Sequence, residues 1–215
     1  AAQFAIGDYI VIYDAEDKPD KDQLKKAFLA FKKSPLDTVC VQARLNFYNY
    51  SFNTLTRLFS LEYSFWYDFF LPGNQEMNSA ITLGGTSNHF ATPYLKKIGY
   101  WDPYNVTEDA DLGLRIFRYR LHTTVFNSYT LEEANSQLGN WLRQRTRWQK
   151  GFLMTLLVNL RHPVRTTREI GLWRYAQSLF SVASNFFLPF FNPVLWVMFA
   201  ASFLPFATPF GIAVP

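Results

Sequence analysis

Acidic residues that could do chemistry gather at two places in this chain, and the first follows an uncharged run. Asp14, Glu16 and Asp17 come directly after residues 9–13, which are aromatic and β-branched. Carboxylates this close together can bind one divalent cation, because Mg²⁺ and Mn²⁺ prefer oxygen ligands and keep positions for phosphate oxygens. The alternative is an acidic turn that caps a helix starting near Pro19.

The second acidic place is Thr107-Glu108-Asp109, at the start of a predicted helix. A carboxylate here could take the proton from an attacking hydroxyl, which typically contributes 10²–10⁴-fold to a rate. The alternative is an N-terminal cap, since the helix dipole favours acids in the first turn, and Asp111 fits that interpretation.

A third group of residues combines amide, cationic and aromatic side chains: Gln144, Arg145, Arg147 and Trp148. Planar guanidinium groups suit phosphate oxygens. The flat face of Trp can stack on a sugar ring. The alternative is a helix at a membrane surface, with Trp as an anchor and the arginines reaching the headgroups.

A glycine pair, Gly84-Gly85, opens a polar loop after the predicted strand 81–83. Glycines there permit close backbone approach to a ligand, and a tight turn is the alternative. His89 ends this loop without a second His at metal-ligand spacing, so it does not indicate a metal site.

The elements that must position these residues alternate along the chain. Strands are predicted at 9–13, 38–42, 81–83 and 123–126, with helices after Pro19, over 53–70 and over 106–119. Pro72-Gly73-Asn74 is predicted to end the second helix. This alternation indicates an α/β fold with a mostly parallel sheet, in which the strand at 9–13 is buried.

The chain changes character after about residue 139. Basic and apolar residues alternate over 141–156 and again over 163–173, which predicts amphipathic helices at a bilayer surface. Residues 175–215 carry no charge, and this run exceeds the roughly 20 residues that one membrane span needs. We expect a span over about 175–200, kinked at Pro189 or Pro193, and the start of another. The alternative is a buried helical hairpin.

The basic residues are concentrated just before this apolar run, although the net charge is only +4. Arg143 to Arg174 contains eight Lys or Arg and one acid, Glu169. A solvated helix face and a nucleic-acid patch are possible interpretations, but the position favours the cytoplasmic flank of a membrane span. Cys40 is the single cysteine, which excludes an internal disulfide and a cysteine zinc cluster. No signal-peptide pattern is visible.

Taken in order, the acidic cluster, Thr-Glu-Asp and Gln-x-x-Arg-Trp resemble the family 2 glycosyltransferases over about residues 5–200. The branch that they resemble is the membrane-embedded one related to cellulose and hyaluronan synthases. The resemblance implies a GT-A fold, and inverting transfer from a nucleotide sugar, expected to be a UDP-sugar, to a glycan or lipid-linked acceptor. It also implies Mg²⁺ or Mn²⁺ as cofactor, and a site on the cytoplasmic side of the inner (plasma) membrane, in contact with lipids and without nucleic acid.

The resemblance also assigns roles to individual residues. Asp109 is the expected base. The family's Asp-x-Asp metal motif falls on Asp14 and Glu16, where Glu replaces the second Asp, so Asp17 could contribute instead. The remaining expected roles are pyrophosphate binding by Gln144, Arg147 and Arg145, and acceptor binding by Trp148, Glu108, Thr86, Ser87 and Asn88.

Two further interpretations of the chain's function stay open, and the sequence also predicts three structural parts. The chain could be a non-processive transferase acting on a lipid-linked acceptor, or a non-catalytic membrane scaffold. Nothing in residues 1–13 matches the family's nucleotide-binding strand or its Lys-bearing helix, so we expect a fragment whose activity belongs to a longer protein. The expected parts are a partial GT-A domain (1–138), interface helices (139–174) and a transmembrane segment (175–215).

Overall fold

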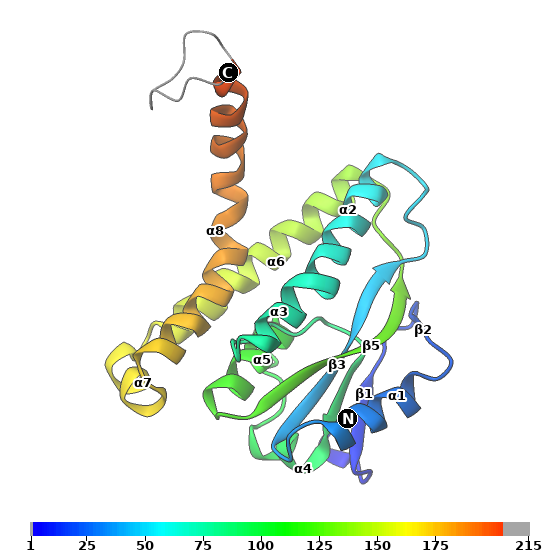
Figure 1. Ribbon diagram of the computed structural model, residues 1–215, viewed down its shortest axis with the longest axis vertical. Helices are drawn as coiled ribbons and strands as arrows, with labels where there is room; N and C mark the ends of the chain where they lie inside the picture. The colour runs from blue at the N-terminus through cyan, green and yellow to red at the C-terminus, as the bar shows by residue number, and fades with distance from the viewer. Residues whose placement is uncertain (1, 204–215) are drawn as a thin grey trace.

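A five-stranded mixed sheet forms the body of the molecule in the computed structural model, which describes residues 2–203 (Figure 1). Strands β3 and β5 are parallel neighbours, and the other three neighbouring pairs are antiparallel. In sheet order, the strands are β1 (Tyr9–Ile12), β4 (Asn88–Ala91), β3 (Thr38–Phe47), β5 (His122–Glu132) and β2 (Lys18–Pro19). Strands β1, β3 and β5 run in one direction, and the α/β class is confirmed. The prediction of a mostly parallel sheet is wrong, because β4 lies antiparallel between β1 and β3, and β2 pairs antiparallel with β5.

Two predicted strands differ from the observed ones. β1 lies at the edge of the sheet, with Tyr9 exposed and the rest half-buried, so the prediction of a buried parallel strand is wrong. Residues 81–83 form no strand. Ile81 and Leu83 are buried there because α5 (Glu108–Arg118) packs directly on their backbone. Only glycine fits at Gly113 in this contact, since a Cβ would lie 2.2 Å from the Ile81 carbonyl oxygen.

The helical rod over residues 54–76 is longer than predicted. It comprises α2 (Thr54–Ser64), a π-helical stretch (Phe65–Phe70) and α3 (Leu71–Glu76). Pro72 lies in the first turn of α3, where a missing N–H is tolerated, so the predicted break at this proline is wrong. The short elements η1 (Ala2–Phe4), α1 (Gln23–Lys33) and α4 (Thr92–Lys97) complete this part of the chain.

The main core lies between the sheet and the helices that cover it. Its fully buried side chains come from β3, β4, α4 and α5, and include Val39, Leu45, Phe90, Leu95, Leu112 and Ile116. A second cluster joins α5 to the C-terminal helices through Leu114, Phe117, Leu156 and Val182. The C-terminal helices are therefore packed onto the sheet domain.

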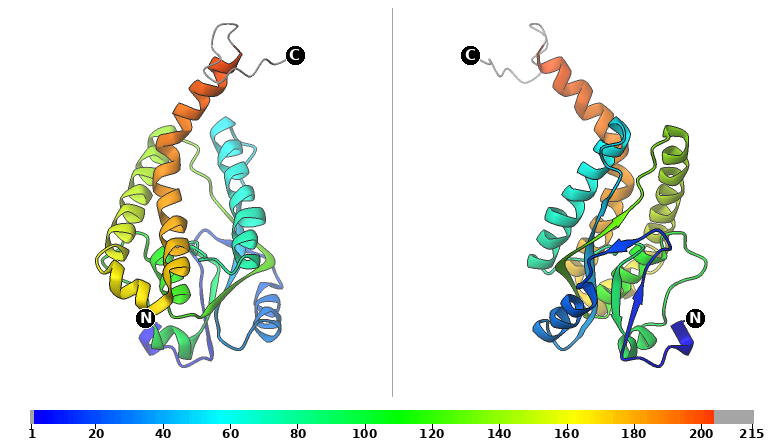
Figure 2. Two further views of the ribbon diagram at one scale, coloured as in Figure 1. Left: turned by 60° about the vertical axis from the view of Figure 1, so that its left-hand side comes forward. Right: turned by 90° about the vertical axis from the view of Figure 1, so that its right-hand side faces the viewer.

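Three helices form the C-terminal part: α6 (Leu138–Asn159), α7 (Pro163–Ile170) and α8 (Leu172–Ser202). α6 and the first half of α8 lie side by side (Figures 1 and 2), and Gln149 Nε2 donates to the Asn185 carbonyl oxygen at 3.1 Å. The first half of α8 buries Tyr175, Ser178 and Val182. The start of α8 is thus part of the protein core.

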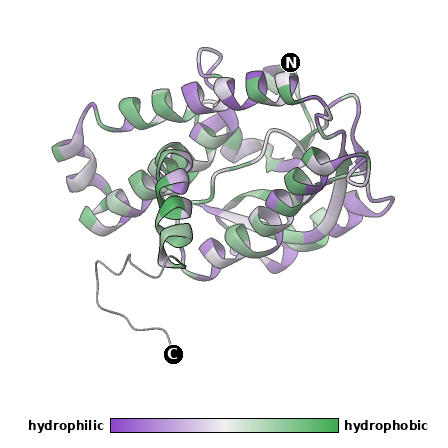
Figure 3. Cartoon of the chain, turned by 90° about the horizontal axis from the view of Figure 1, so that it is seen from above, coloured by the Kyte–Doolittle hydropathy of each residue, from purple (hydrophilic) through white to green (hydrophobic). Residues whose placement is uncertain are grey.

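The second half of α8 stands clear of the body (Figures 1 and 2) and is mostly apolar (Figure 3). Every residue over 187–200 is exposed. Pro189 and Pro193 lie inside α8 without ending it, and the helix changes direction about halfway along (Figure 1). Within the described residues, α8 is the one helix long and apolar enough to cross a membrane. The second predicted span would lie in residues 204–215, outside the described part.

Candidate active site

A cavity of about 560 Å³ lies between α2, the start of α6 and the ends of the strands. Its wall contains residues from all four motif segments, which are far apart in sequence: Asp14, Glu16, Gly84, Gly85, Thr86, Glu108, Asp109, Gln144, Arg145, Arg147 and Trp148. A second cavity of about 580 Å³, between α5 and the start of β5, contains none of these residues. The smaller cavity is therefore the candidate active site.

Asp109 lies in the first turn of α5 and opens on this cavity. Its Oδ1 accepts from the backbone N–H of Ala110 at 2.7 Å. The glycine loop passes against the other oxygen, since a Cβ on Gly85 would lie 3.6 Å from Oδ2. Burial and, to a smaller extent, the charge of Glu108 raise the pKa of Asp109 to about 7, although the Ala110 hydrogen bond opposes the shift. A carboxyl group with a pKa near 7 is suited to accepting a proton at neutral pH.

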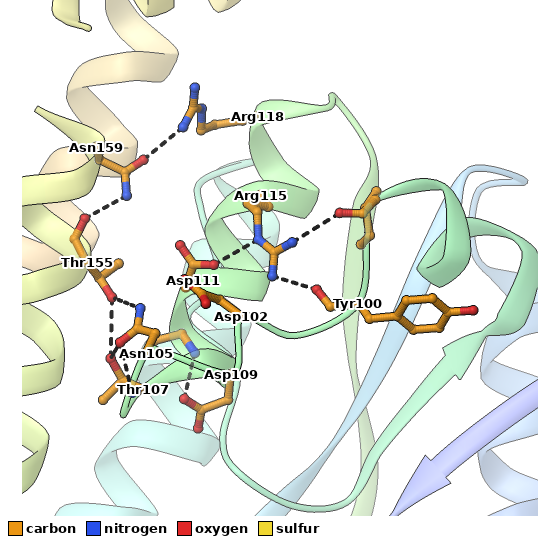
Figure 4. A network of polar contacts seen from close by, with 12 residues as sticks. Tyr100, Asp102, Asn105, Thr107, Asp109, Asp111, Arg115, Arg118, Thr155 and Asn159 are labelled. Carbon is orange, nitrogen blue, oxygen red and sulfur yellow. Dashed lines mark hydrogen bonds and ion pairs between the residues drawn. The ribbon is translucent and has the colours of Figure 1, made fainter. Parts of the chain in front are cut away.

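A polar network holds the helix start that carries Asp109 (Figure 4). Arg115 bonds Asp111 at 2.8 Å and reaches the carbonyl oxygens of Ile98 and Tyr100 at 3.0 and 2.6 Å. These contacts fix α5 against the loop that precedes it. Asp111 is thus an ion-pair partner inside the helix and does not line the cavity.

The helix that carries the Gln-x-x-Arg-Trp motif docks on the loop that carries Thr107. Asn105 Nδ2 donates to Thr155 Oγ1 at 2.7 Å, and Asn105 Oδ1 accepts from the Thr107 N–H at 3.1 Å (Figure 4). One turn earlier, only glycine fits at Gly151, because a Cβ would lie 2.4 Å from Thr107 Cγ2. α6 and the Asp109 loop therefore form one packed unit.

The acidic cluster after β1 divides into two roles. Asp14 and Glu16 line the cavity, whereas Asp17 does not. Asp17 Oδ2 instead accepts from the Asp14 N–H at 2.8 Å and from the Thr86 hydroxyl. Burial, followed by the charges of Asp17, Glu16 and Glu108, raises the pKa of Asp14. Asp17 thus shapes the turn that presents Asp14.

The cavity carries an excess of negative charge, since seven acidic side chains and two arginines line it. Both terminal nitrogens of Arg145 bind Glu62, at 2.7 and 2.5 Å. Within residues 2–203, no three His, Cys, Asp or Glu side chains form a metal site on their own. Two carboxylates that face an acidic cavity nevertheless fit a divalent cation whose remaining ligands are water and diphosphate oxygens.

The cationic side of the cavity belongs to α6. Arg145 lies in an aromatic box, with its guanidinium 4.7 Å from the Phe59 ring, 4.8 Å from Trp148 and 5.1 Å from Trp141. Arg147 makes no hydrogen bond or ion pair with any residue that the structure describes. Trp148 is half-buried against Phe59, with ring centroids 6.3 Å apart. Arg147 is thus the arginine available to an anionic ligand.

The expected residues of the acceptor loop separate in the structure. Thr86 and Glu108 line the cavity. Ser87 and Asn88 are buried in the sheet, where Ser87 Oγ donates to Thr130 Oγ1 at 2.6 Å and Asn88 Nδ2 donates to the Gly84 carbonyl oxygen at 2.5 Å. The geometry does not bring these two side chains to the cavity.

The sequence interpretation missed an acidic pair at the end of β5, Glu132 and Glu133, which also lines the cavity. Burial, with the charges of Asp17, Asp14 and Glu16, raises the pKa of Glu132 to about 8. Glu133 accepts from the Tyr48 hydroxyl at 2.9 Å. The available signal was the alternating pattern that continues beyond residue 126 and ends at these two acids.

A sheet whose strand ends carry carboxylates, facing a helix start and an arginine–tryptophan wall, is the arrangement that the resemblance to GT-A sugar transferases implies. Consistent with that class, the glycosyl transferase family group 2 model matches residues 9–214, and the chain belongs to this family.

Curated relatives and a solved structure agree with this assignment. The chain is 26% identical over 190 residues to the "Probable glycosyltransferase YdaM" of Bacillus subtilis (strain 168), covering 88% of the chain and 44% of that protein. It is 23% identical over 180 residues to the "Probable glucomannan 4-beta-mannosyltransferase 2" of Oryza sativa subsp. japonica, covering 81% of the chain and 30% of that protein. The chain therefore spans less than half the length of these relatives.

The solved structure is the mannosyltransferase PcManGT from Pyrobaculum calidifontis in complex with GDP-Man and Mn²⁺. The TM-score is 0.56 at 14% identity, over 97% of this chain and 58% of that chain. At this identity the likeness concerns the fold, and it confirms the predicted GT-A architecture.

Proposed function

We propose that the chain forms the catalytic part of a membrane-associated, inverting glycosyltransferase that uses a nucleotide-sugar donor. The observation that carries this proposal is the convergence of Asp14, Asp109, Arg147 and Trp148 on one cavity. The chain order of these motifs is that of the family to which the chain belongs.

In the proposed reaction, Asp109 takes the proton from an acceptor hydroxyl as its oxygen attacks the anomeric carbon. The bond between that carbon and the diphosphate oxygen breaks on the opposite face, and the nucleoside diphosphate leaves with the electron pair. A single displacement of this kind inverts the anomeric configuration. A divalent cation held by Asp14 and Glu16 would neutralise the leaving diphosphate.

The α6 wall supplies binding and orientation in this proposal. Arg147 contacts the pyrophosphate, and Gln144, which accepts from Asn135 Nδ2 at 2.9 Å, orients the same group. Trp148 stacks under the acceptor sugar, with Thr86 and Glu108 beside it. Arg145, bound by Glu62 and three rings, acts by holding Trp148 in place.

The donor is proposed at the level of a nucleotide sugar. The family resemblance favours a UDP-sugar, whereas the names of the rice relative and the solved neighbour include mannosyl transfer, which adds GDP-mannose. A glycan and a lipid-linked sugar are the two acceptor classes. Full-length protein in membranes, incubated with a panel of labelled nucleotide sugars, tests the proposal, with Asp109→Asn as the matched control. Donor binding without transfer to any acceptor fraction would favour the non-catalytic scaffold.

We also propose that the second half of α8 spans the inner membrane and that the catalytic part faces the cytoplasm. The exposed and mostly apolar residues 187–200 support this. A rise of 1.5 Å per residue makes this stretch about 20 Å long, so the remainder of a hydrocarbon core about 30 Å thick would be crossed by the uncharged sequence that follows. The expected division at residues 138 and 174 then needs one refinement, because the start of α8 belongs to the protein core.

Cysteine labelling tests this topology. In a Cys40→Ala background, Val164→Cys lies on an exposed position of α7 and should react with an impermeant maleimide only after the cell is opened. Val197→Cys should resist the reagent in both conditions. Labelling of the Val164 probe in intact spheroplasts would contradict the proposed side.

A further inference from the structure

One end of the domain presents exposed apolar side chains on two neighbouring segments. Tyr50 and Phe52, in the loop before α2, are 56% and 73% exposed. Leu138 and Leu142, in the first turns of α6, are 60% and 50% exposed. We call these four residues the apolar tip. It lies outside the candidate active site, since none of the four lines that cavity.

Hydrogen bonds hold the loop that carries Tyr50 and Phe52 against the segment before α6. Asn49 exchanges hydrogen bonds with the backbone of Ala134, at 2.9 and 2.8 Å, and Asn53 Nδ2 donates to the Ser136 carbonyl oxygen at 2.8 Å. Asn53 also caps α2. The loop therefore presents its aromatic side chains outward while the side chains of Asn49 and Asn53 are bonded internally.

The charged residues within the two segments that carry the tip are basic. No acid occurs over residues 47–61 or over residues 134–168. Arg57 and Arg143, in the same two segments, are exposed. Two acids that border these ranges, Glu62 and Glu133, are bonded to Arg145 and to the Tyr48 hydroxyl. Exposed aromatic and aliphatic residues beside Arg57 and Arg143 match the headgroup region of an anionic bilayer.

The position of the tip relates it to the emerging half of α8. The N-terminal ends of α2 and α6 lie at the same end of the body from which the second half of α8 projects (Figures 1 and 2). A flat surface that the projecting half of α8 crosses can thus meet the tip as well.

We propose that the apolar tip is a second membrane contact, which inserts into the headgroup layer of an anionic bilayer beside the point where α8 enters. This inference rests on the proposed membrane span of α8. With two separated contacts the domain cannot swivel about α8, so the mouth of the cavity next to Trp148 is held at a fixed height above the lipid.

Site-specific quenching tests the contact on the full-length protein in vesicles of phosphatidylcholine and phosphatidylglycerol. A nitrobenzoxadiazole probe is attached to Phe52→Cys in a Cys40→Ala background, and nitroxide lipids place the quencher at the headgroup or deep in the acyl chain. Leu36→Cys is the matched control, because Leu36 is 98% exposed and precedes the opposite end of β3, roughly 30 Å away. Val197→Cys reports on α8.

We expect headgroup nitroxide to quench the Phe52 probe at least threefold more than the Leu36 probe. Replacing Arg57 and Arg143 by Gln should reduce that quenching to its level in vesicles without phosphatidylglycerol. Equal quenching of the Phe52 and Leu36 probes, with the Val197 probe quenched by deep nitroxide, would overturn the tip contact and leave the span intact. Loss of quenching at Val197 as well would overturn the span, and the tip contact with it.

Discussion

The two walls of the cavity are built in opposite ways. The acidic wall consists of side chains on strand ends and on the start of α5, where Asp14, Asp109 and Glu132 all have raised pKa values because burial and like charges disfavour ionisation. The α6 wall carries two arginines, one tied to Glu62 and one with no partner among the described residues. The acidic wall is therefore strained electrostatically until a cation arrives, whereas the α6 wall is already half neutralised.

This difference teaches which side of the site depends on ligands. Apart from Glu62, which is paired with Arg145, six acidic side chains line the cavity and Arg147 is the one arginine there without a partner among the described residues. A diphosphate donor is itself an anion, so its arrival cannot reduce the repulsion among these carboxylates. A divalent cation can reduce this repulsion, and it also supplies the positive charge that the donor needs. Removing the cation, the base or either arginine tests whether the two walls differ in this way.

Removal of the divalent cation should have the largest effect. We expect excess chelator to abolish sugar transfer by the full-length enzyme, and added Mg²⁺ or Mn²⁺ to restore it, because the acidic wall would otherwise repel the donor diphosphate. Radiolabelled transfer measures this, with residual metal determined by elemental analysis. Undiminished transfer in metal-free samples would contradict the proposed role of Asp14 and Glu16.

Asp109→Asn should have the next largest effect. The variant keeps the shape of the side chain but cannot accept a proton, so turnover should fall by about two orders of magnitude or more while donor binding stays. For the wild type, turnover should rise between pH 6 and 8, since Asp109 must be ionised and its pKa is about 7. Turnover of the variant within threefold of the wild type would rule out Asp109 as the base.

The two arginines should differ in the kind of defect they cause. Arg147→Gln should raise the donor KM about tenfold and leave the thermal midpoint unchanged, because the structure gives Arg147 no partner within residues 2–203. Arg145→Gln should instead lower the stability by about 2–4 kcal/mol, since it loses the Glu62 ion pair and three aromatic contacts, each worth roughly 0.5–1 kcal/mol. Steady-state kinetics and thermal unfolding of both variants separate these roles. Identical defects would show that both arginines bind the donor.

The sequence predicted the fold class and the convergence of its motifs, because strand ends and helix starts of an α/β fold meet at one edge of the sheet. It did not reveal that Ser87 and Asn88 are both buried away from the cavity, because Ser87 has a φ of 56° and the chain there does not follow the alternation of a strand. It did not separate Arg145 from Arg147, because the aromatic box depends on Phe59 from a distant helix.

Local pattern also misjudged the limits of the helices. Pro72 was predicted to end the helix, but the helical rod continues through the π-helical stretch and α3 to Glu76. Pro72 lies in the first turn of α3, where the missing N–H is tolerated. The apolar run after Tyr175 was predicted to enter the membrane at once. Composition could not show that Val182 packs against α5 and α6. Because of this packing, the fully exposed part of α8 begins only at residue 187.

The smallest predicted effect concerns stability and isolates the acidic wall itself. The pKa of Glu132 is about 8 in the folded protein, above its ordinary value of 4.5. Folding therefore disfavours its ionised form, and the cost is absent below pH 4.5, grows as the pH rises to 8, and is constant above that. Glu132→Gln should thus stabilise the chelator-treated protein by about 1 kcal/mol or more at pH 8.5, and change little at pH 4.

The neighbouring Glu133→Gln is the matched control, because Glu133 is exposed and should shift stability by less than about 0.5 kcal/mol. Thermal unfolding in detergent at the two pH values measures both variants. A Glu132→Gln variant that is less stable than the wild type at pH 8.5 would mean that this carboxylate is already compensated, and that the contrast between the two walls is smaller than their charges indicate.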